Sequence, residues 1–272
     1  MLWRIHAGLA GTQLPAIKEW VAAQGDVLQV VDGPLRGLEP PPLLEDGVPG
    51  LALTTLNDAS RLDWNAIPGR YWDAKMYQVS FYLPRLESAT PALNRGGVFL
   101  PVGCLHHLAH LGLFEQGAFI RPDSGQKPFP GQALEAEQLK QASSDLMTRY
   151  KLAPDLLCYC APSRAVEPLE WRFWIVNREV VAWSPYAWES EEPWADAPSD
   201  VLEVARQMAA NPWQPDIAYV ADVAIAERNP YLLELNAAST SGLYQVPIDK
   251  LFSALRVAAH QELAGELELF AS

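Results

Sequence analysis

The sequence is poor in cysteine and in basic residues, and it contains no long apolar run. Its 272 residues include three cysteines, and 20 Lys and Arg against 33 Asp and Glu, for a formal net charge of −13. An odd number of irregularly spaced cysteines argues against a disulfide framework. The negative charge disfavours binding to nucleic acid, because phosphate backbones need dense Lys and Arg. No apolar stretch approaches the roughly 20 residues that span a membrane. The N-terminus lacks the pattern of a signal peptide, so we expect a cytoplasmic protein.

Several familiar motifs are also absent. The chain contains no GxxxxGK[ST], no GxGxxG and no GxSxG, so a P-loop, a dinucleotide-binding fold and a nucleophile elbow have no motif support. His106 and His110 have the spacing of a metal-binding helix, but the HExxH glutamate is missing, which favours packing or surface roles. Cys158 and Cys160 form a CxC pair without a second pair, and two small core residues are the favoured interpretation.

The N-terminal part alternates strand-like and helix-like segments. Residues 1–7 and 26–32 resemble strands, and residues 14–25 between them resemble a helix that ends at Gly25, where a C-cap glycine belongs. This β-α-β order predicts a parallel sheet, to which residues 50–56 would add a third strand.

Two stretches of this part are less regular. Residues 38–50 include three consecutive prolines and predict a loop. Residues from about 60 to 95 are rich in aromatic residues without a clear period, and packing of the small domain is their favoured role over lining an acceptor pocket.

The rest of the chain also predicts strands and helices in alternation. The expected elements are a strand and a short helix within 96–114, a strand and a polar turn within 117–131, a helix over 133–152, a strand over 155–160, two strands over 170–186 around Asn177 and Arg178, a helix over 198–211, strands over 216–227 and 230–236, and a closing amphipathic helix over 247–267.

Polar side chains interrupt two of these strands on matching faces. Because strand side chains alternate between faces, Leu232, Glu234 and Asn236 are expected to share one face of their strand. Val220 and Asp222 are expected to share one face of the preceding strand. The pattern therefore places an acid and an amide where a core strand would stay apolar.

A hairpin would bring these polar groups together. If its loop is centred near Arg228, Asp222 falls opposite Glu234 to within about one residue, and Asn236 lies at the same end of the sheet. Two carboxylates at that distance repel each other unless a cation lies between them. Mg²⁺ prefers such hard oxygen ligands and completes its shell with water and phosphate. The alternative is that the acids sit at strand ends in water, but three coordinated positions favour a metal site.

A metal that bridges phosphates implies cations nearby. Arg121 at a strand end and Lys127 after a turn containing Gly125 could hold phosphate charge, although an exposed basic loop is the alternative. Arg172 lies within an aromatic strand and needs a partner, because a buried unpaired charge is costly. That partner could be Glu170, another protein acid, or a ligand phosphate.

Four segments, taken in order, resemble a known family. "FIRPDSGQKPFPG", "EWRFWIVNREVVAWSPY", "YVADVAIAE" and "YLLELNAASTSGLY" resemble ATP-grasp proteins. They are most similar to the divergent clade named for two signature arginines and a lysine, which includes the cell-division-cycle protein 123 family and small bacterial and phage proteins. The resemblance extends from about residue 95 to 262, and the first 90 residues fit only loosely, as a reduced pre-ATP-grasp domain.

The resemblance implies an α+β fold in which two α+β subdomains clasp ATP. Residues 1–92 would form a small N-terminal α/β domain, and residues 93–272 the ATP-grasp domain, with subdomains at 93–161 and 162–272. Arg121 and Lys127 match the clade's basic residues that contact the phosphates, and Arg172 matches a basic residue near the phosphates or the acceptor. Asp222, Glu234 and Asn236 match its magnesium ligands. The adenine-reading linker is matched by Cys158, Tyr159, Cys160 and Ala161.

The implied activity is that of an ATP- and Mg²⁺-dependent carboxylate–amine ligase acting through an acyl-phosphate, with a peptide or protein among the conceivable acceptors. Residues 239–242 are small, and their backbone could approach a phosphate or the acceptor. Two alternatives stay open, namely a non-catalytic ATP-binding assembly factor or chaperone, and a kinase-like phosphotransferase. The expected partners are ATP and an acceptor, with no nucleic acid and no membrane.

Overall fold

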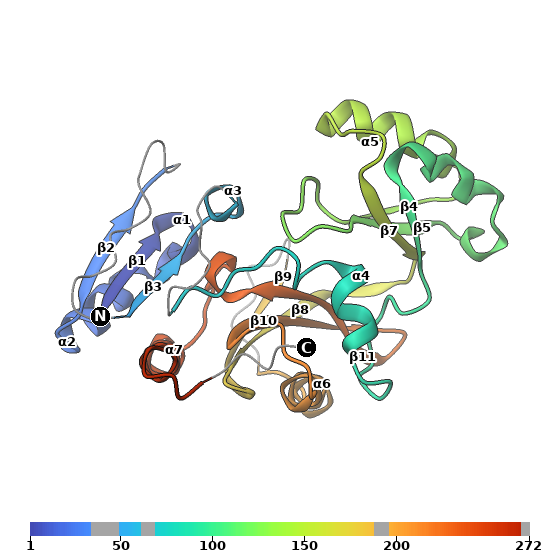
Figure 1. Ribbon diagram of the computed structural model, residues 1–272. Coiled ribbons are helices and arrows are strands. Elements are labelled where there is room, and N and C mark those ends of the chain that lie inside the picture. Colours follow the sequence, from blue (N-terminus) through green and yellow to red (C-terminus); the bar gives the residue numbers. More distant parts are fainter. Residues whose placement is uncertain (34–48, 61–68, 188–195, 268–272) are drawn as a thin grey trace.

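Three small β-sheets organise the chain (Figure 1). The computed structural model describes residues 1–33, 49–60, 69–187 and 196–267. The first sheet has the order β2-β1-β3 and is parallel throughout. Its strands are β1 (Leu2–His6), β2 (Val27–Val31) and β3 (Gly50–Leu53).

The β-α-β opening is confirmed. Helix α2 (Leu14–Ala23) connects β1 to β2 and is followed by Gly25 with φ +68°, the left-handed conformation expected after a helix end. The proline-rich loop expected over 38–50 falls almost wholly outside the described residues.

The second sheet, drawn in greens in Figure 1, lies almost wholly within residues 93–161, which we call the first subdomain. It is antiparallel with the order β4-β7-β5-β6. Its strands are β4 (Val98–Pro101), β5 (Ala118–Pro122), β6 (Gln132–Leu134) and β7 (Leu157–Pro162). The expected helix over 133–152 is wrong in its first half, because β6 pairs with β5 there and α5 begins only at Ala142 (Ala142–Tyr150).

The third sheet has the antiparallel order β11-β10-β8-β9 and lies within residues 162–272, which we call the second subdomain. Its strands are β8 (Val166–Val176), β9 (Glu179–Ala187), β10 (Ala218–Ala226) and β11 (Asn229–Ala237). Both of its hairpins turn on two residues with positive φ, as two-residue hairpin loops require. These are Asn177 and Arg178 (48° and 64°), and Glu227 and Arg228 (51° and 68°). Both predicted turns are therefore confirmed.

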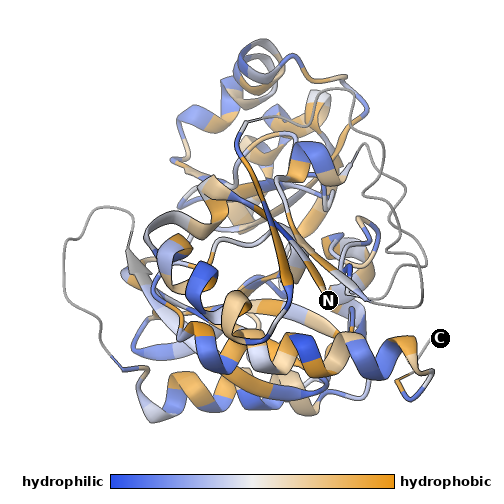
Figure 2. Cartoon of the chain, turned by 90° about the vertical axis from the view of Figure 1, so that its left-hand side faces the viewer, coloured by the Kyte–Doolittle hydropathy of each residue, from blue (hydrophilic) through white to orange (hydrophobic). Residues whose placement is uncertain are grey.

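Two long helices pack against the third sheet. Helix α6 (Ser199–Ala210) buries Val204 and Met208 in the core that contains Phe173 and Ala221. Helix α7 (Ile248–Leu263) packs its apolar residues both on Trp174 and on the N-terminal domain. Hydrophilic and hydrophobic residues alternate along the helices in Figure 2, as expected of amphipathic surface helices. The second subdomain and the N-terminal domain therefore share a core.

Short helical turns complete the described residues. They are α1 (Ala7–Ala10), α3 (Leu56–Ala59) and α4 (Val79–Tyr82), with 3₁₀ turns η1 (Gly11–Gln13), η2 (Leu83–Arg85), η3 (Val102–His110), η4 (Gly112–Phe114), η5 (Gln138–Gln141) and η6 (Ala238–Thr240). In the part of the chain that the structure describes, no helix has both the length and the apolar character needed to span a membrane.

The aromatic stretch near residue 75 packs inside the molecule. Trp72, Tyr77 and Tyr82 are buried in the core of the second subdomain, and Tyr71 joins the core shared with the N-terminal domain. These aromatic residues therefore have the preferred packing role, but Trp72, Tyr77 and Tyr82 pack in the second subdomain and not in the small domain as expected. Residues 61–68 lie outside the described ranges. The His106 ring packs on Ser143, with its Nδ1 3.1 Å from Oγ.

Candidate functional site

The hairpin of β10 and β11 aligns the expected polar groups. Asp222 lies directly opposite Glu234, and Asn236 lies opposite Val220. The two-residue loop alone would set Asp222 opposite Leu233, and one extra residue in β11 brings Glu234 opposite Asp222 instead. The prediction that Asp222 and Glu234 face each other is confirmed.

A β-bulge changes the face of one residue. The pairing shifts between Asp222 and Val223, which lie opposite Glu234 and Leu232, so that Leu233 is the extra residue of the bulge. Leu232 is therefore turned away from Glu234 and is buried beside Leu235, which corrects the expectation that Leu232 shares the polar face. Leu233 instead lines the cavity next to Glu234. Bulges often serve to re-aim a side chain next to a functional site.

Six polar side chains meet at this hairpin. Three are the cations expected near phosphates, and three are the expected metal ligands. Lys127 Nζ donates to both Glu234 oxygens at 2.9 Å and to Asn236 Oδ1 at 2.6 Å. Arg121 Nη2 lies 3.1 Å from Glu234 Oε2. The first subdomain thus reaches across to the second through Arg121 and Lys127.

The two cations control the charge of Glu234. Burial alone would raise the pKa of this carboxyl, but Lys127 and Arg121 outweigh burial and hold the pKa well below its usual range. Asn236 Nδ2 also donates to Glu234 Oε1 at 3.0 Å. Glu234 is therefore ionised at neutral pH and ready to hold a cation.

Arg172 and Asp222 form the deeper half of the cluster. Arg172 donates from Nε to Asp222 Oδ1 at 2.9 Å and from Nη2 to Oδ2 at 2.7 Å. Asn236 Nδ2 donates to the same Oδ2 at 2.7 Å. Asp222 is fully buried and Arg172 nearly so. Of the partners considered for Arg172, the structure therefore provides a protein acid, Asp222.

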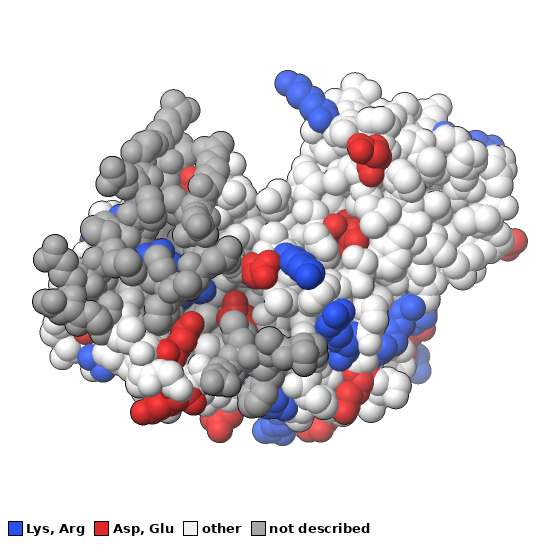
Figure 3. Space-filling model, viewed as in Figure 1, with Lys and Arg blue, Asp and Glu red and all other residues white. Residues whose placement is uncertain are grey.

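A cavity of about 560 Å³ opens beside the cluster. Arg121, Lys127 and Glu234 line it, whereas Asp222 lies deeper. The surface is hollowed beside the first subdomain, and acidic and basic side chains lie next to each other there (Figure 3). The volume falls within the range of small-molecule sites.

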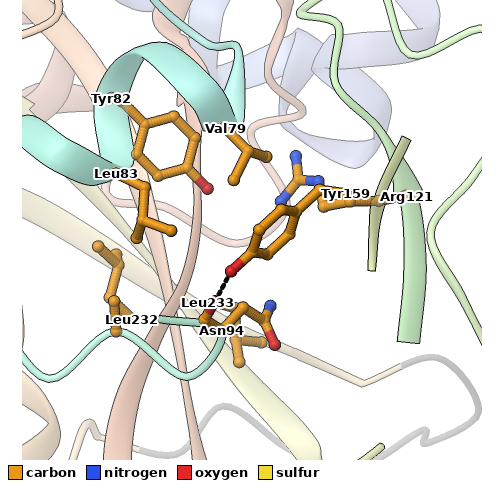
Figure 4. A pocket seen from close by; sticks show the side chains of 9 residues that line it. Val79, Tyr82, Leu83, Asn94, Arg121, Tyr159, Leu232 and Leu233 are labelled. Atoms are coloured by element: carbon orange, nitrogen blue, oxygen red, sulfur yellow. Dashed lines mark hydrogen bonds between the residues drawn. The ribbon is translucent and has the colours of Figure 1, made fainter. Parts of the chain in front are cut away.

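Two tyrosines hold Arg121 in place. Figure 4 shows Arg121 beside Tyr159, the residue paired with it on the neighbouring strand, and Tyr82 on helix α4 across a small void. Tyr159 donates its hydroxyl proton to the carbonyl of Asn94 and accepts from Gly97 N at 2.9 Å. The Arg121 side chain is therefore guided toward Glu234 by a packed wall.

The turn that carries Lys127 is also held tightly. A Cβ on Gly125 would lie 2.3 Å from the carbonyl oxygen of Ala74, so only glycine allows this approach. Lys127 has φ +46°, and its amide donates to Ser124 O at 3.2 Å. The lysine backbone is thus fixed, and motion of the ammonium is left to the side chain.

The segment that is expected to read adenine lies within strand β7. Cys158, Tyr159 and Cys160 form the middle of β7, where β4 pairs on one side and β5 on the other. Both cysteines are buried in the core of the first subdomain, as core residues rather than zinc ligands would be. Ala161 pairs with Phe119 of β5, near the end of the strand. The backbone of this segment is therefore mostly committed to the sheet.

The cavity wall includes residues that sequence patterns did not single out. Ser163 and Arg164, in the connection from β7 to β8, line it, as do Phe119 and Phe129. The available signal was position, because the connection between two subdomains borders any cleft between them.

The small residues after β11 bind protein rather than facing the cavity. Ser239 Oγ accepts from Tyr71 N at 2.9 Å, and Ser239 O accepts from Thr54 N at 2.7 Å. Ser241 Oγ donates to Ala237 O at 2.9 Å. Both serines are buried, so this segment fastens β11 to the N-terminal domain, and the expected approach of its backbone to phosphate has no support.

Comparisons with known proteins agree with this geometry. The family model that matches residues 70–255 describes an ATP-grasp domain, family 3 of the clade named for two arginines and a lysine. No curated protein sequence matches the chain. The structure is similar to D-alanine–D-alanine ligase from Bacillus anthracis, with TM-score 0.65 and 11% identity, covering 98% of this chain and 100% of that chain.

Two further solved structures are similar. D-cycloserine synthetase DcsG has TM-score 0.63 and 12% identity, and the match covers 97% of this chain and 100% of that chain. The ATP-grasp ligase PsnB complexed with a precursor peptide and AMPPNP has TM-score 0.56 and 13% identity, and the match covers 95% of this chain and 97% of that chain. At these identities the likeness concerns the fold, and the predicted ATP-grasp fold is confirmed.

Proposed function

Since the chain belongs to the ATP-grasp family, in the clade named for two arginines and a lysine, we propose that it is an ATP- and Mg²⁺-dependent carboxylate–amine ligase. Family membership and the likeness of the chain to ligase structures support an ATP-dependent ligase without specifying its substrates. The finer assignment rests on one observation, the convergence of three cations, two acids and an amide beside a cavity.

The proposed reaction has two steps. A carboxylate oxygen of the substrate attacks the γ-phosphorus of ATP, the bond to the β,γ-bridging oxygen breaks, and ADP leaves. An amine then attacks the acyl-phosphate carbon, the bond from that carbon to the phosphate oxygen breaks, and inorganic phosphate leaves as the amine loses a proton. Such chemistry depends on positioning and charge neutralisation more than on a protein nucleophile.

Arg121 and Lys127 are the proposed phosphate-binding residues. Both line the cavity and come from the first subdomain. Charge-assisted hydrogen bonds from such donors to phosphate oxygens would neutralise the charge that develops during transfer. Arg172, which donates two hydrogen bonds to Asp222, would add positive potential from the buried side of the cluster.

Glu234 and Asn236 are the proposed primary metal ligands. Their oxygens already surround the Lys127 ammonium, an arrangement that supports a cation site, and carboxylate and amide oxygens suit Mg²⁺. Asp222 completes the proposed set, and its carboxylate orients Asn236 through Nδ2. When bound, Mg²⁺ would neutralise phosphate oxygens and draw the γ-phosphoryl group into position.

Adenine is proposed to lie against the connection between the subdomains. Ser163 and Arg164 line the cavity there, and Phe119 and Phe129 supply apolar surface. We prefer this position to the backbone of residues 158–160, because that backbone is paired on both sides within the sheet.

The acceptor is proposed to be an amino acid or a peptide. Two of the similar structures support this class, since one is named as a ligase of D-alanine and the other is complexed with a precursor peptide. Amino acids and peptides both carry the amine that the second step of the proposed reaction needs.

Glu234→Gln tests the proposal. We expect ADP release with ATP, Mg²⁺ and acceptor mixtures to fall by at least about 100-fold, because charge stabilisation of this kind is worth that much. Glu203→Gln, an exposed position on α6, is the matched control and should keep wild-type turnover. Circular dichroism should show both variants folded.

Three results would separate the alternatives. Wild-type protein that binds AMPPNP but never releases ADP would be an assembly factor. A product heavier by one phosphoryl group, found by mass spectrometry, would indicate a kinase. Full activity in Glu234→Gln would end the proposed metal site.

A further inference from the structure

The ammonium of Lys127 occupies the side of the cluster that faces the cavity. Lys127 Nζ donates to Glu234 Oε1 and Oε2, each at 2.9 Å, and to Asn236 Oδ1 at 2.6 Å. An ammonium has three donors and no acceptor, and each donor here has an oxygen partner. These oxygens are the same atoms that are proposed to hold Mg²⁺.

The oxygen set is oriented before any ligand arrives. Asn236 Nδ2 donates to Asp222 Oδ2 at 2.7 Å and to Glu234 Oε1 at 3.0 Å. Because Asn236 Nδ2 donates to both carboxylates, Asn236 Oδ1 must point the other way, toward Lys127. The cation position is therefore built by the hairpin itself and is not an accident of one flexible side chain.

The charge of the cluster disfavours a free divalent ion. Three cationic side chains, Arg121, Lys127 and Arg172, are paired with two acids, Asp222 and Glu234. A metal ion arriving alone would have to displace the Lys127 ammonium from the same oxygens, with Arg121 also beside Glu234, and like charges repel at these distances. A triphosphate adds negative charge beside the cluster and offers Lys127 other oxygen partners, so the metal becomes favourable only in its presence.

The two ion pairs differ in how easily they can exchange partners. The Lys127 and Glu234 side chains are 27% and 25% exposed, whereas those of Arg172 and Asp222 are 9% and 0% exposed. A partly exposed pair contributes little net free energy and is readily replaced. Breaking a buried pair leaves an uncompensated charge. The exchange of cations would therefore take place at Lys127.

We propose that the Lys127 ammonium occupies the metal position of the free protein, so that a divalent cation enters only together with the triphosphate. Lys127 would then exchange its hydrogen bonds to Glu234 and Asn236 for hydrogen bonds to phosphate oxygens. The same movement would bring its ammonium to the γ-phosphate. Lys127 is in this sense a positioning residue as well as a phosphate ligand. The inference rests on the proposed function, since it needs Glu234 and Asn236 to be metal ligands.

Binding of Mn²⁺ alone tests the inference without any activity. The full chain is titrated with Mn²⁺ in the absence of nucleotide, and free Mn²⁺ is followed by electron paramagnetic resonance. We expect Lys127→Met to bind Mn²⁺ at least about tenfold more tightly than wild type, because the competing charge is gone. Lys127→Gln provides a second neutral variant. Lys127→Arg, which keeps the charge, should behave like wild type, as should the distant control Lys140→Met.

The outcomes separate this inference from the proposed function. Equal Mn²⁺ affinity in wild type and in both neutral variants would overturn the inference. The proposed metal site would still stand in that case if wild type retained Mn²⁺ after equilibrium dialysis with AMPPNP. If no form binds Mn²⁺ even with AMPPNP, the metal site fails and the inference fails with it.

Discussion

Two acidic clusters in this molecule look alike in their contacts and differ in their surroundings. In the N-terminal domain, Asp26 Oδ2 accepts from Trp3 Nε1 at 3.0 Å and from Arg256 Nε at 2.9 Å. Burial acts to raise the pKa of Asp26, but these partners together with the N-terminal ammonium lower it to about 2. In the second subdomain, Glu234 is held by Lys127 and Arg121 in the same manner.

Access distinguishes the two clusters. The Asp26 side chain is 3% exposed, whereas that of Glu234 is 25% exposed and lines the large cavity. Ion pairs and a shifted pKa are therefore not enough to identify a functional site. A cluster becomes a candidate site when its carboxylate can exchange a protein partner for a ligand.

Asp222→Asn should give the largest loss of stability. The change removes the carboxylate that compensates the buried charge of Arg172, which typically costs about 3–5 kcal/mol. Urea unfolding followed by circular dichroism measures the change in the free energy of unfolding. The double variant Asp222→Asn with Arg172→Met should be more stable than Asp222→Asn alone, because it removes the uncompensated charge. A cost below about 1 kcal/mol for Asp222→Asn would contradict the structural role of this pair.

Asp26→Asn should have an intermediate effect, on stability only. Losing charge-assisted hydrogen bonds to Arg256 and Trp3 should cost about 1.5–3 kcal/mol in unfolding free energy at pH 7. Nucleotide binding at a permissive temperature should stay at the wild-type level. Weakened AMPPNP binding in this folded variant would erase the distinction between the two clusters.

The same variant gives a pH test. The pKa of Asp26 is about 2 in the folded protein and about 3.9 in an unfolded chain. A lowered folded-state pKa contributes stability above the unfolded value, and this contribution is lost as the pH falls from about 4 to about 2. The gap between the melting temperatures of wild type and Asp26→Asn should therefore be constant near neutral pH and shrink below pH 4. A gap that widens on acidification would refute this assignment.

Glu203→Gln should have the smallest effect. Glu203 and Arg206 form an exposed pair on α6, 3.9 Å apart, with side chains 55% and 60% exposed. Such pairs contribute less than about 0.5 kcal/mol, so melting temperature and nucleotide binding should both match wild type. A clear loss of melting temperature or of nucleotide binding would show that the exposure of an acidic side chain does not determine the effect of its removal.

Much of the site could be predicted from local pattern. The two-residue turns at Asn177 and at Glu227 set the register beside each turn, so spacing places Asp222 within one residue of Glu234, and the bulge at Leu233 completes their pairing. Arg172 was also identifiable, because an arginine in an apolar strand needs a partner. Arg121 and Lys127 were identifiable by their places at a strand end and after a turn.

Two wrong predictions, for the face of Leu232 and for strand β6, share one cause. The bulge at Leu233 arises where Leu232 exchanges backbone hydrogen bonds with Pro91 and Leu93, residues about 140 positions earlier in the chain. The same holds for β6, which pairs with β5 although its sequence looks helical. In both places backbone pairing with another segment outweighed the local preference, and that segment is the neighbouring strand for β6 and a far earlier one for Leu232.

The sequence by itself determined the strands, the tight turns and the alternation of side chains, because these depend on neighbours a few residues apart. It also determined which side chains carry charge at the ends of those strands. Only the tertiary structure decided which cation meets which acid, which pair is open to a cavity, and where the chain crosses between subdomains. Those outcomes depend on burial and on contacts between distant segments, and no local pattern encodes how much water remains beside a carboxylate.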